Sequence, residues 1–188
     1  MASSRILGGL FSLLAAATLL TACGEDQSQN TPLQATPSSS VGCKSGQAYA
    51  HSTLGYQLCY PNGWTSRDYT AEPGSGGAVS VVAFGPPSAV PVHVPSNGTF
   101  IPPIEVRVVA GAKADPEQSL AQGNQVSQTQ VAGLAADKIT VVDAGAASGT
   151  VIVVFEHQGN TFEVEEAPGG AYDAAFQQVL TSFTFPSS

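Results

Sequence analysis

Alternating apolar and polar residues predict β-strands along most of residues 54–165. The clearest segment is 104–110 (IEVRVVA), where aliphatic side chains alternate with charged ones, as in a strand with one buried and one wet face. Residues 54–60 (LGYQLCY) put apolar side chains at every second position and end at a Pro-Asn-Gly turn. Further strands are predicted at 79–84, 126–131, 138–142, 151–155 and 162–165.

Two features place some of these strands relative to one another. Residues 151–155 (VIVVF) are apolar on both faces, which favours the middle of a sheet that is covered on both sides. Hairpin bends are predicted at Ala132-Gly133 and at 157–160 (HQGN), because glycine tolerates the positive φ of tight hairpin turns. The sheet is therefore expected to be antiparallel.

Helical periodicity occurs in two segments. Residues 115–122 have Asp115 as a predicted N-cap, Pro116 at the first helical position and Gly123 beyond the end. After a Pro-Gly-Gly stretch, apolar residues recur at helical spacing and form one stripe: Tyr172, Ala175, Phe176, Val179, Leu180 and Phe183. Strands with one central and one terminal helix predict a single α+β domain, an antiparallel β-sheet flanked by helices.

A long proline-rich connection, residues 86–103, interrupts the predicted sheet. It holds six prolines together with several valines, and connections longer than about 12 residues are usually functional or disordered. The prolines favour a stiff, functional loop. We expect it to bind a partner through Pro87, Val92, His93 and Phe100.

The N-terminal residues predict export. Met1 to Arg5 supply one positive charge, and residues 6–20 form an apolar run that is shorter than the about 20 residues of a membrane-spanning helix. Leu20-Thr21-Ala22-Cys23 resembles the lipobox of bacterial lipoproteins. That resemblance implies cleavage before Cys23 and acylation of its thiol. The alternative is an ordinary secretory signal that is cleaved near Ala22 and leaves a free thiol.

These features divide the chain into a signal peptide (1–22), a polar flexible tether (23–42) and a folded domain (43–188). The tether is rich in Gln, Ser, Asn, Thr and Pro, so it buries too little apolar surface to fold. The expected location is the exported side of a bacterial cell membrane or outer membrane. The bilayer is the first expected partner, through acylated Cys23.

Two further cysteines, Cys43 and Cys59, remain in the exported part of the chain. Exported proteins usually pair such cysteines, so we predict a disulfide that closes a loop of about 16 residues and contributes on the order of 3 kcal/mol. A reactive thiol or a metal-binding pair is the alternative.

The charge of the chain disfavours nucleic acid as a partner. The formal net charge is −8 and only six residues are Lys or Arg, scattered along the chain, so no basic surface for nucleic acid is predicted. A low content of charged residues with an acidic balance is more typical of solubility than of binding.

Short motifs then resemble a known family. Residues 56–64 (YQLCYPNGW) are similar to the opening strand and Pro-x-Gly-Trp turn of the PsbP and Mog1 fold. Residues 131–136, 155–165 and 176–185 resemble its middle hairpin, closing hairpin and last helix. The resemblance implies an α/β/α sandwich and a non-enzymatic accessory, assembly or binding role. Trp64 is interpreted as a core side chain in preference to a binding platform.

No catalytic or cofactor motif is present in the sequence: it lacks Gly-x-Ser-x-Gly, His-Glu-x-x-His, a phosphate loop and a dinucleotide fingerprint. We expect no enzymatic activity, no cofactor and a monomer. Glu163 and Glu165 alternate with Phe162 and Val164. The pair is a candidate for a hard cation, although a solvated sheet face is the preferred interpretation.

Two functions remain open. The first is an accessory or assembly factor that binds an envelope protein through the proline-rich loop. The second is a carrier or sensor for a lipid, a small ligand or a divalent cation.

Overall fold

A computed structural model describes residues 42–95, 100–142 and 144–186, apart from the side chains of 114–116. All of these residues belong to one compact unit, in agreement with the single domain expected. The predicted signal peptide, Cys23 and all of the tether except Gly42 lie outside the described residues. Within the described residues no helix has both the length and the apolar character needed to cross a membrane.

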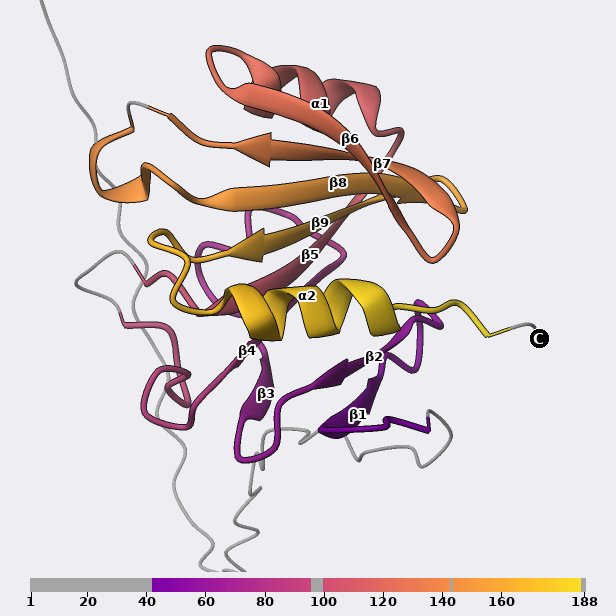
Figure 1. Ribbon diagram of the computed structural model, residues 1–188, viewed down its shortest axis with the longest axis vertical. Helices are drawn as coiled ribbons and strands as arrows, with labels where there is room; N and C mark the ends of the chain where they lie inside the picture. The colour runs from indigo at the N-terminus through magenta and orange to yellow at the C-terminus, as the bar shows by residue number, and fades with distance from the viewer. Residues whose placement is uncertain (1–41, 96–99, 143, 187–188) are drawn as a thin grey trace, which may run out of the picture. The chain divides into compact units, whose positions relative to one another are not determined.

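The domain is built on a seven-stranded antiparallel sheet with the strand order β3-β4-β5-β9-β8-β7-β6 (Figure 1). Its strands are β3 (Thr65–Asp68), β4 (Ser80–Gly85), β5 (Ile104–Ala110), β9 (Asn160–Glu166), β8 (Val151–His157), β7 (Leu134–Thr140) and β6 (Gln125–Val131). A separate antiparallel pair consists of β1 (Gln47–Ala50) and β2 (Gln57–Tyr60). The antiparallel sheet expected from the sequence is confirmed.

The two helices pack on opposite faces of the large sheet. Helix α2 (Asp173–Ser182) buries Ala175, Phe176 and Val179 in the main core, which includes one face of β4, β5, β8 and β9. Helix α1 (Ala114–Ala121) contributes Leu120 to a smaller cluster with Ile139 and Ile152. Side chains of a strand alternate between faces, so these two isoleucines point away from α2. We call the two sides of the sheet the α2 face and the α1 face.

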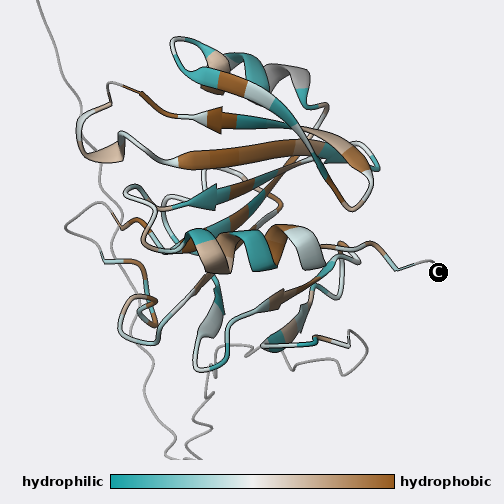
Figure 2. Ribbon diagram, in the orientation of Figure 1, coloured by the Kyte–Doolittle hydropathy of each residue, from teal (hydrophilic) through white to brown (hydrophobic). Residues whose placement is uncertain are grey.

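Aromatic rings fill the main core beneath α2. Phe155 and Phe162 stack at 5.3 Å across the β8–β9 pair, and Phe183 meets Phe155 edge-on at 5.4 Å. Tyr56, just before β2, stacks on Phe183 at 5.1 Å and meets Phe162 of β9 edge-on at 5.8 Å, which connects the β1–β2 pair to α2 and to the sheet. Figure 2 shows β8 as an almost continuous hydrophobic strand, and its residues 152–155 are buried. The prediction of a central strand covered on both sides is confirmed.

The hairpin turns also fall where glycine predicted them. Ala132 and Gly133 have φ values of 53° and 77°, and Gln158 and Gly159 have 50° and 73°. Consecutive residues in the left-handed region are the signature of the tight turns that match strand twist. These turns fix the β6–β7 and β8–β9 registers.

Some predicted boundaries are wrong. The strand expected at 54–60 begins only at Gln57, because His51 accepts backbone N–H bonds from Leu54 and Gly55 and closes a turn there. The strand expected at 138–142 spans Leu134–Thr140. The central helix begins at Ala114 with Lys113 as N-cap, so Asp115 does not cap it.

Candidate functional site

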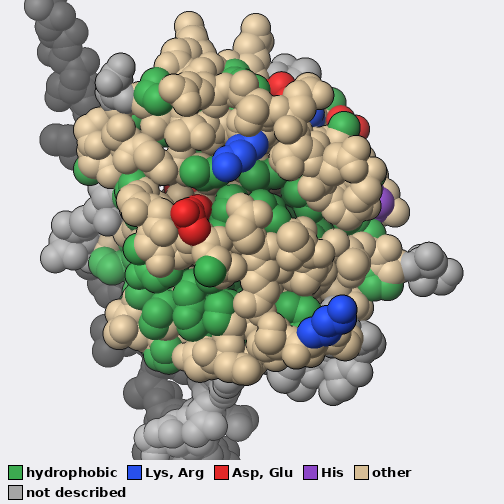
Figure 3. All heavy atoms as spheres, in the orientation of Figure 1, with side chains coloured by type: hydrophobic (Ala, Val, Ile, Leu, Met, Phe, Trp, Pro, Cys, Tyr) green, Lys and Arg blue, Asp and Glu red, His purple; other side chains and the backbone are tan. Residues whose placement is uncertain are grey.

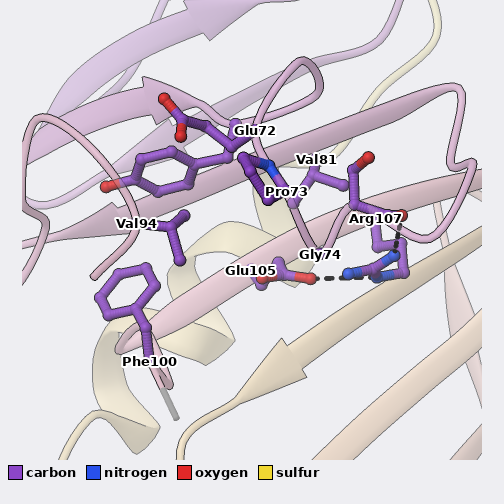
Figure 4. A pocket seen from close by; sticks show the side chains of 10 residues that line it. Glu72, Pro73, Gly74, Val81, Val94, Phe100, Glu105 and Arg107 are labelled. Atoms are coloured by element: carbon purple, nitrogen blue, oxygen red, sulfur yellow. Dashed lines mark hydrogen bonds and ion pairs between the residues drawn. The ribbon is translucent and has the colours of Figure 1, made fainter. Parts of the chain in front are cut away.

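Two loops meet on the α1 face and enclose a cavity of about 170 Å³ (Figure 4). One loop connects β3 to β4, and the other is the proline-rich connection between β4 and β5. The floor comes from the sheet, through Val81 of β4 and Glu105 and Arg107 of β5. The walls come from the loops: Tyr69, Glu72, Pro73, Gly74, Ser75, Val94 and Phe100.

The base of the proline-rich loop is held rigidly against the sheet edge. Arg67 of β3 donates from Nε to the Val90 carbonyl at 3.0 Å, and the Tyr69 hydroxyl donates to the Pro91 carbonyl. Val90 is fully buried. Gly85 permits this close approach, because a Cβ there would lie 2.7 Å from Pro103 and 2.8 Å from Val90. Hydrogen bonds and packing therefore add to the stiffness that the prolines give the loop.

The walls of the cavity are mainly apolar. Tyr69 and Phe100 meet edge-on, with ring centroids 5.6 Å apart, and both pack in a cluster with Val81, Val90 and Val94. His93 Nδ1 lies 2.8 Å from Glu72 Oε1, which joins the two loops.

The four loop residues singled out from the sequence have different surroundings. Phe100 is half-buried and lines the cavity. Val92 is 52 % exposed, and Pro87 and His93 are also exposed. The structure therefore leaves three of them accessible and places the fourth inside the site. Their role in binding stays a prediction.

The floor carries charge that is only partly compensated. Arg107 donates from Nε to Glu105 at 3.2 Å and from a terminal nitrogen to the Ser75 carbonyl at 2.6 Å. In the β5–β9 register Glu105 lies opposite Glu165, and Arg107 lies opposite Glu163. Three carboxyl groups therefore share one guanidinium on this part of the α1 face.

Burial dominates the electrostatics of these carboxyl groups. Burial raises the pKa of Glu105 and Glu163, and Arg107 opposes the rise in both. For Glu165, burial and then the neighbouring Glu105 raise the pKa to about 7. The expectation that Glu163 and Glu165 share one face is confirmed. Their expected exposure is wrong, because both are half-buried.

The surroundings of Glu163 and Glu165 give little support for a metal site. Among residues 42–95, 100–142 and 144–186, no group of three or more His, Cys, Asp or Glu side chains is placed to hold a metal ion. The carboxylates of Glu163 and Glu165 also have the positive charge of Arg107 as a neighbour, which offsets part of their attraction for a cation.

The contact between His51 and Ser80 lacks the features of a catalytic pair. The Leu54 backbone N–H donates to Nδ1 of His51, so the neutral ring carries its proton on Nε2 and donates it to Ser80 Oγ at 3.1 Å. A general base needs the opposite arrangement, with Nε2 free to accept the hydroxyl proton. Burial lowers the pKa of His51, which keeps the ring neutral, and Ser80 is only 1 % exposed.

Sequence reasoning missed Tyr69, Glu105 and Arg107 as site residues. The alternating pattern identified Glu105 and Arg107 as polar positions of a strand. It could not show that two loops lie over them, because that depends on tertiary structure. Tyr69 follows a short polar strand without a recognisable pattern, so no local signal marked it.

Comparisons with known proteins identify no family for this chain. No family model matches it, and no curated protein matches it. Among solved structures, the solution structure of cyanobacterial PsbP (CyanoP) from Synechocystis sp. PCC 6803 is similar, with a TM-score of 0.45 and 16 % sequence identity. The match covers 78 % of this chain and 96 % of that protein. At this level of similarity nothing about ligands or partners carries over.

Proposed function

We propose that this protein is a non-enzymatic lipoprotein of the bacterial envelope that binds a protein partner at the cavity between the β3–β4 loop and the proline-rich loop. One observation carries the proposal: the proline-rich loop is fixed at its base, and the residues that directly follow this base are exposed. Arg67 and Tyr69 hold Val90 and Pro91, whereas the next two residues, Val92 and His93, are exposed. A preorganised loop binds with a smaller loss of conformational entropy.

The size of the cavity favours a protein partner over a small-molecule ligand. Pockets for drug-sized ligands usually have volumes of about 300–1,000 Å³, whereas this cavity has about 170 Å³. It suits one side chain that a partner inserts beside Tyr69 and Phe100, with the surrounding loop surface completing the contact. Apolar and aromatic residues next to an exposed loop are typical of such anchor sites.

Surface charge supports a protein partner over nucleic acid. Figure 3 shows the α2 face, opposite the cavity, where Lys and Arg side chains occur singly and form no basic patch. The whole chain has six basic and 14 acidic residues, which disfavours a polyanion.

Partner capture from native membranes tests the binding site. We expect a stoichiometric protein partner to co-purify with the tagged chain in mild detergent, and Val92→Asp or Phe100→Ala to reduce its yield at least tenfold. Ser148→Asp, which adds the same charge to an exposed loop between β7 and β8, should leave the yield unchanged. Mass spectrometry of bound proteins and of extracted small molecules distinguishes the two functions. A bound lipid or ion without a protein partner would favour the carrier.

Acylation of Cys23 has its own test. In cells given a labelled fatty acid, we expect the chain to carry the label and to sediment with membranes, and Cys23→Ser to abolish both. A wild-type chain that is unlabelled and released as a soluble protein would instead support cleavage near Ala22 by an ordinary secretory pathway.

A further inference from the structure

The two edges of the large sheet differ in how they are protected. An edge strand exposes unpaired backbone N–H and C=O groups, and proteins usually protect it by shortness, charge, proline or a covering loop. The β3 edge has such protection: it is four residues long and carries Arg67 and Asp68, and Arg67 is bonded to the proline-rich loop.

In the part of the chain that the structure describes, the β6 edge lacks the short length, the charge and the proline that would protect it. Strand β6 is seven residues long (QVSQTQV) and contains neither charge nor proline. It pairs with β7 through an unbroken register from Gln125 opposite Thr140 to Val131 opposite Leu134, so no bulge twists it away. Within the part of the chain that the structure describes, β7 is its only sheet neighbour.

The side chains of β6 are also unusually accessible for a strand of a large sheet. Residues 125–128 are all exposed, and Val126 is 45 % exposed although it is aliphatic. This combination of a long edge without a bulge, outward backbone groups and an accessible valine is typical of a strand-pairing surface.

We propose that β6 pairs antiparallel with β6 of a second copy of this chain, about a twofold axis at Gln128. In this register Gln125 lies opposite Val131 of the second copy, Val126 opposite Gln130, and Ser127 opposite Thr129. Every residue of the strand then has a partner, and the sheet continues across the interface. This proposal replaces the monomer expected from the sequence, and it is independent of the cavity described above.

Symmetry favours a second copy over a different protein, and the absence of charge on β6 permits it. The chain has a formal net charge of −8, so two copies repel wherever their acidic surfaces meet, and an uncharged contact such as β6 minimises that repulsion. A twofold interface must be complementary to itself. Glutamine, serine and threonine satisfy this condition because each side chain both donates and accepts hydrogen bonds.

A contact of one strand pair is small, so the dimer is expected to depend on concentration. Stable interfaces usually bury about 1,200–2,000 Å² in total, more than one pair of edge strands provides. Chains that are concentrated in one membrane would pair far more readily than the same chains in dilute solution.

Cysteine cross-linking in native membranes tests the pairing. In full-length chains, single variants at 126, 128 and 130 and at the β3 residue Ser66 are treated with a short bismaleimide, and products are separated under reducing conditions. We expect Gln128→Cys to give a band at twice the monomer mass, because residue 128 lies on the axis and faces its own copy. Ser66→Cys should give none. Gln128→Cys combined with Gln130→Pro should lose most of the product, since proline removes a backbone donor that points away from β7 and toward the second copy.

Other results would overturn the proposal. If no β6 variant forms a homodimer band, even after solubilised chains are concentrated, the edge does not bind a second copy. A dominant product of different mass would assign the edge to another protein. Equal yields from the Ser66→Cys and Gln128→Cys chains would show collisional cross-linking only. Circular dichroism of each variant excludes unfolding as the cause of a negative result.

Discussion

Raising the pH from about 5 to about 8 is expected to destabilise this domain by roughly 4–6 kcal/mol, because one buried and one half-buried carboxyl group must ionise in the folded state. Glu165 and Glu166 both have a pKa raised to about 7. A rise from about 4.5 to about 7 corresponds to about 3.5 kcal/mol for each group at about 1.4 kcal/mol per pKa unit, of which about 2.5 kcal/mol falls between pH 5 and pH 8.

The sign follows from where protons are bound. Between the unfolded pKa of about 4.5 and the folded pKa of about 7, the folded chain holds protons that the unfolded chain has released. The folded state therefore loses stability progressively as the pH rises through this window. Below it both states are protonated, and the full stability is present.

Glu166 is the more constrained of the two groups. It is 2 % exposed, and in the sheet register it lies between Ile104 and Val151. Burial, followed by a hydrogen bond with Asp173 in the first turn of α2, raises its pKa, and Oε1 has no hydrogen-bond partner among the described residues. Ionisation would leave a negative charge beneath the start of α2 with that oxygen unpaired.

Urea denaturation at several pH values checks this prediction. Relative to the wild type, Glu165→Gln and Glu166→Gln should each gain about 2–3 kcal/mol of stability between pH 5 and pH 8. Glu156→Gln is the matched control, because Glu156 is an exposed glutamate on the neighbouring strand. A wild-type stability that stays constant from pH 5 to pH 8 would contradict the prediction.

Glu166 also shows how far sequence patterns reach. Alternation along Phe162, Val164 and Glu166 puts all three on the same face, so the burial of Glu166 was implicit in the pattern that placed Phe162 in the core. Periodicity gave the face of each strand and the apolar stripe of α2 because both depend on local geometry. The glycine turns were predictable for the same reason.

Features that depend on distant segments were not predictable in this way. Strands β1 and β3 are only four residues long, too short to establish a period. The half-burial of Glu163 and Glu165 and the cavity beside Glu105 arise from tertiary contacts across the sheet and its loops. The sequence predicted a functional proline-rich loop, but the residues that hold it, Arg67 and Tyr69, precede it by a whole strand.

The disulfide is one long-range contact that was predicted, and the structure shows the Cys43–Cys59 bond. Its surroundings give it a structural role. Cys59 is only 4 % exposed, and its backbone N–H donates to Ser182 Oγ at 2.8 Å at the end of α2. The bond therefore fixes the first described residues of the domain to a strand that packs directly on α2.

Removing this bond is expected to lower the free energy of unfolding by about 3 kcal/mol, since it closes a loop with a sequence separation of 16. The Cys43→Ala/Cys59→Ala chain should show this loss in denaturation under oxidising conditions and should be insensitive to added reductant. The wild type should fall to nearly the same stability when it is reduced. The constraint acts mainly on the unfolded chain. Hydrogen exchange in β5, β8 and β9 should therefore become faster only to the extent that global stability falls. Selective loss of protection in β2 and the last turn of α2 would instead mean that the bond mainly holds local native structure together.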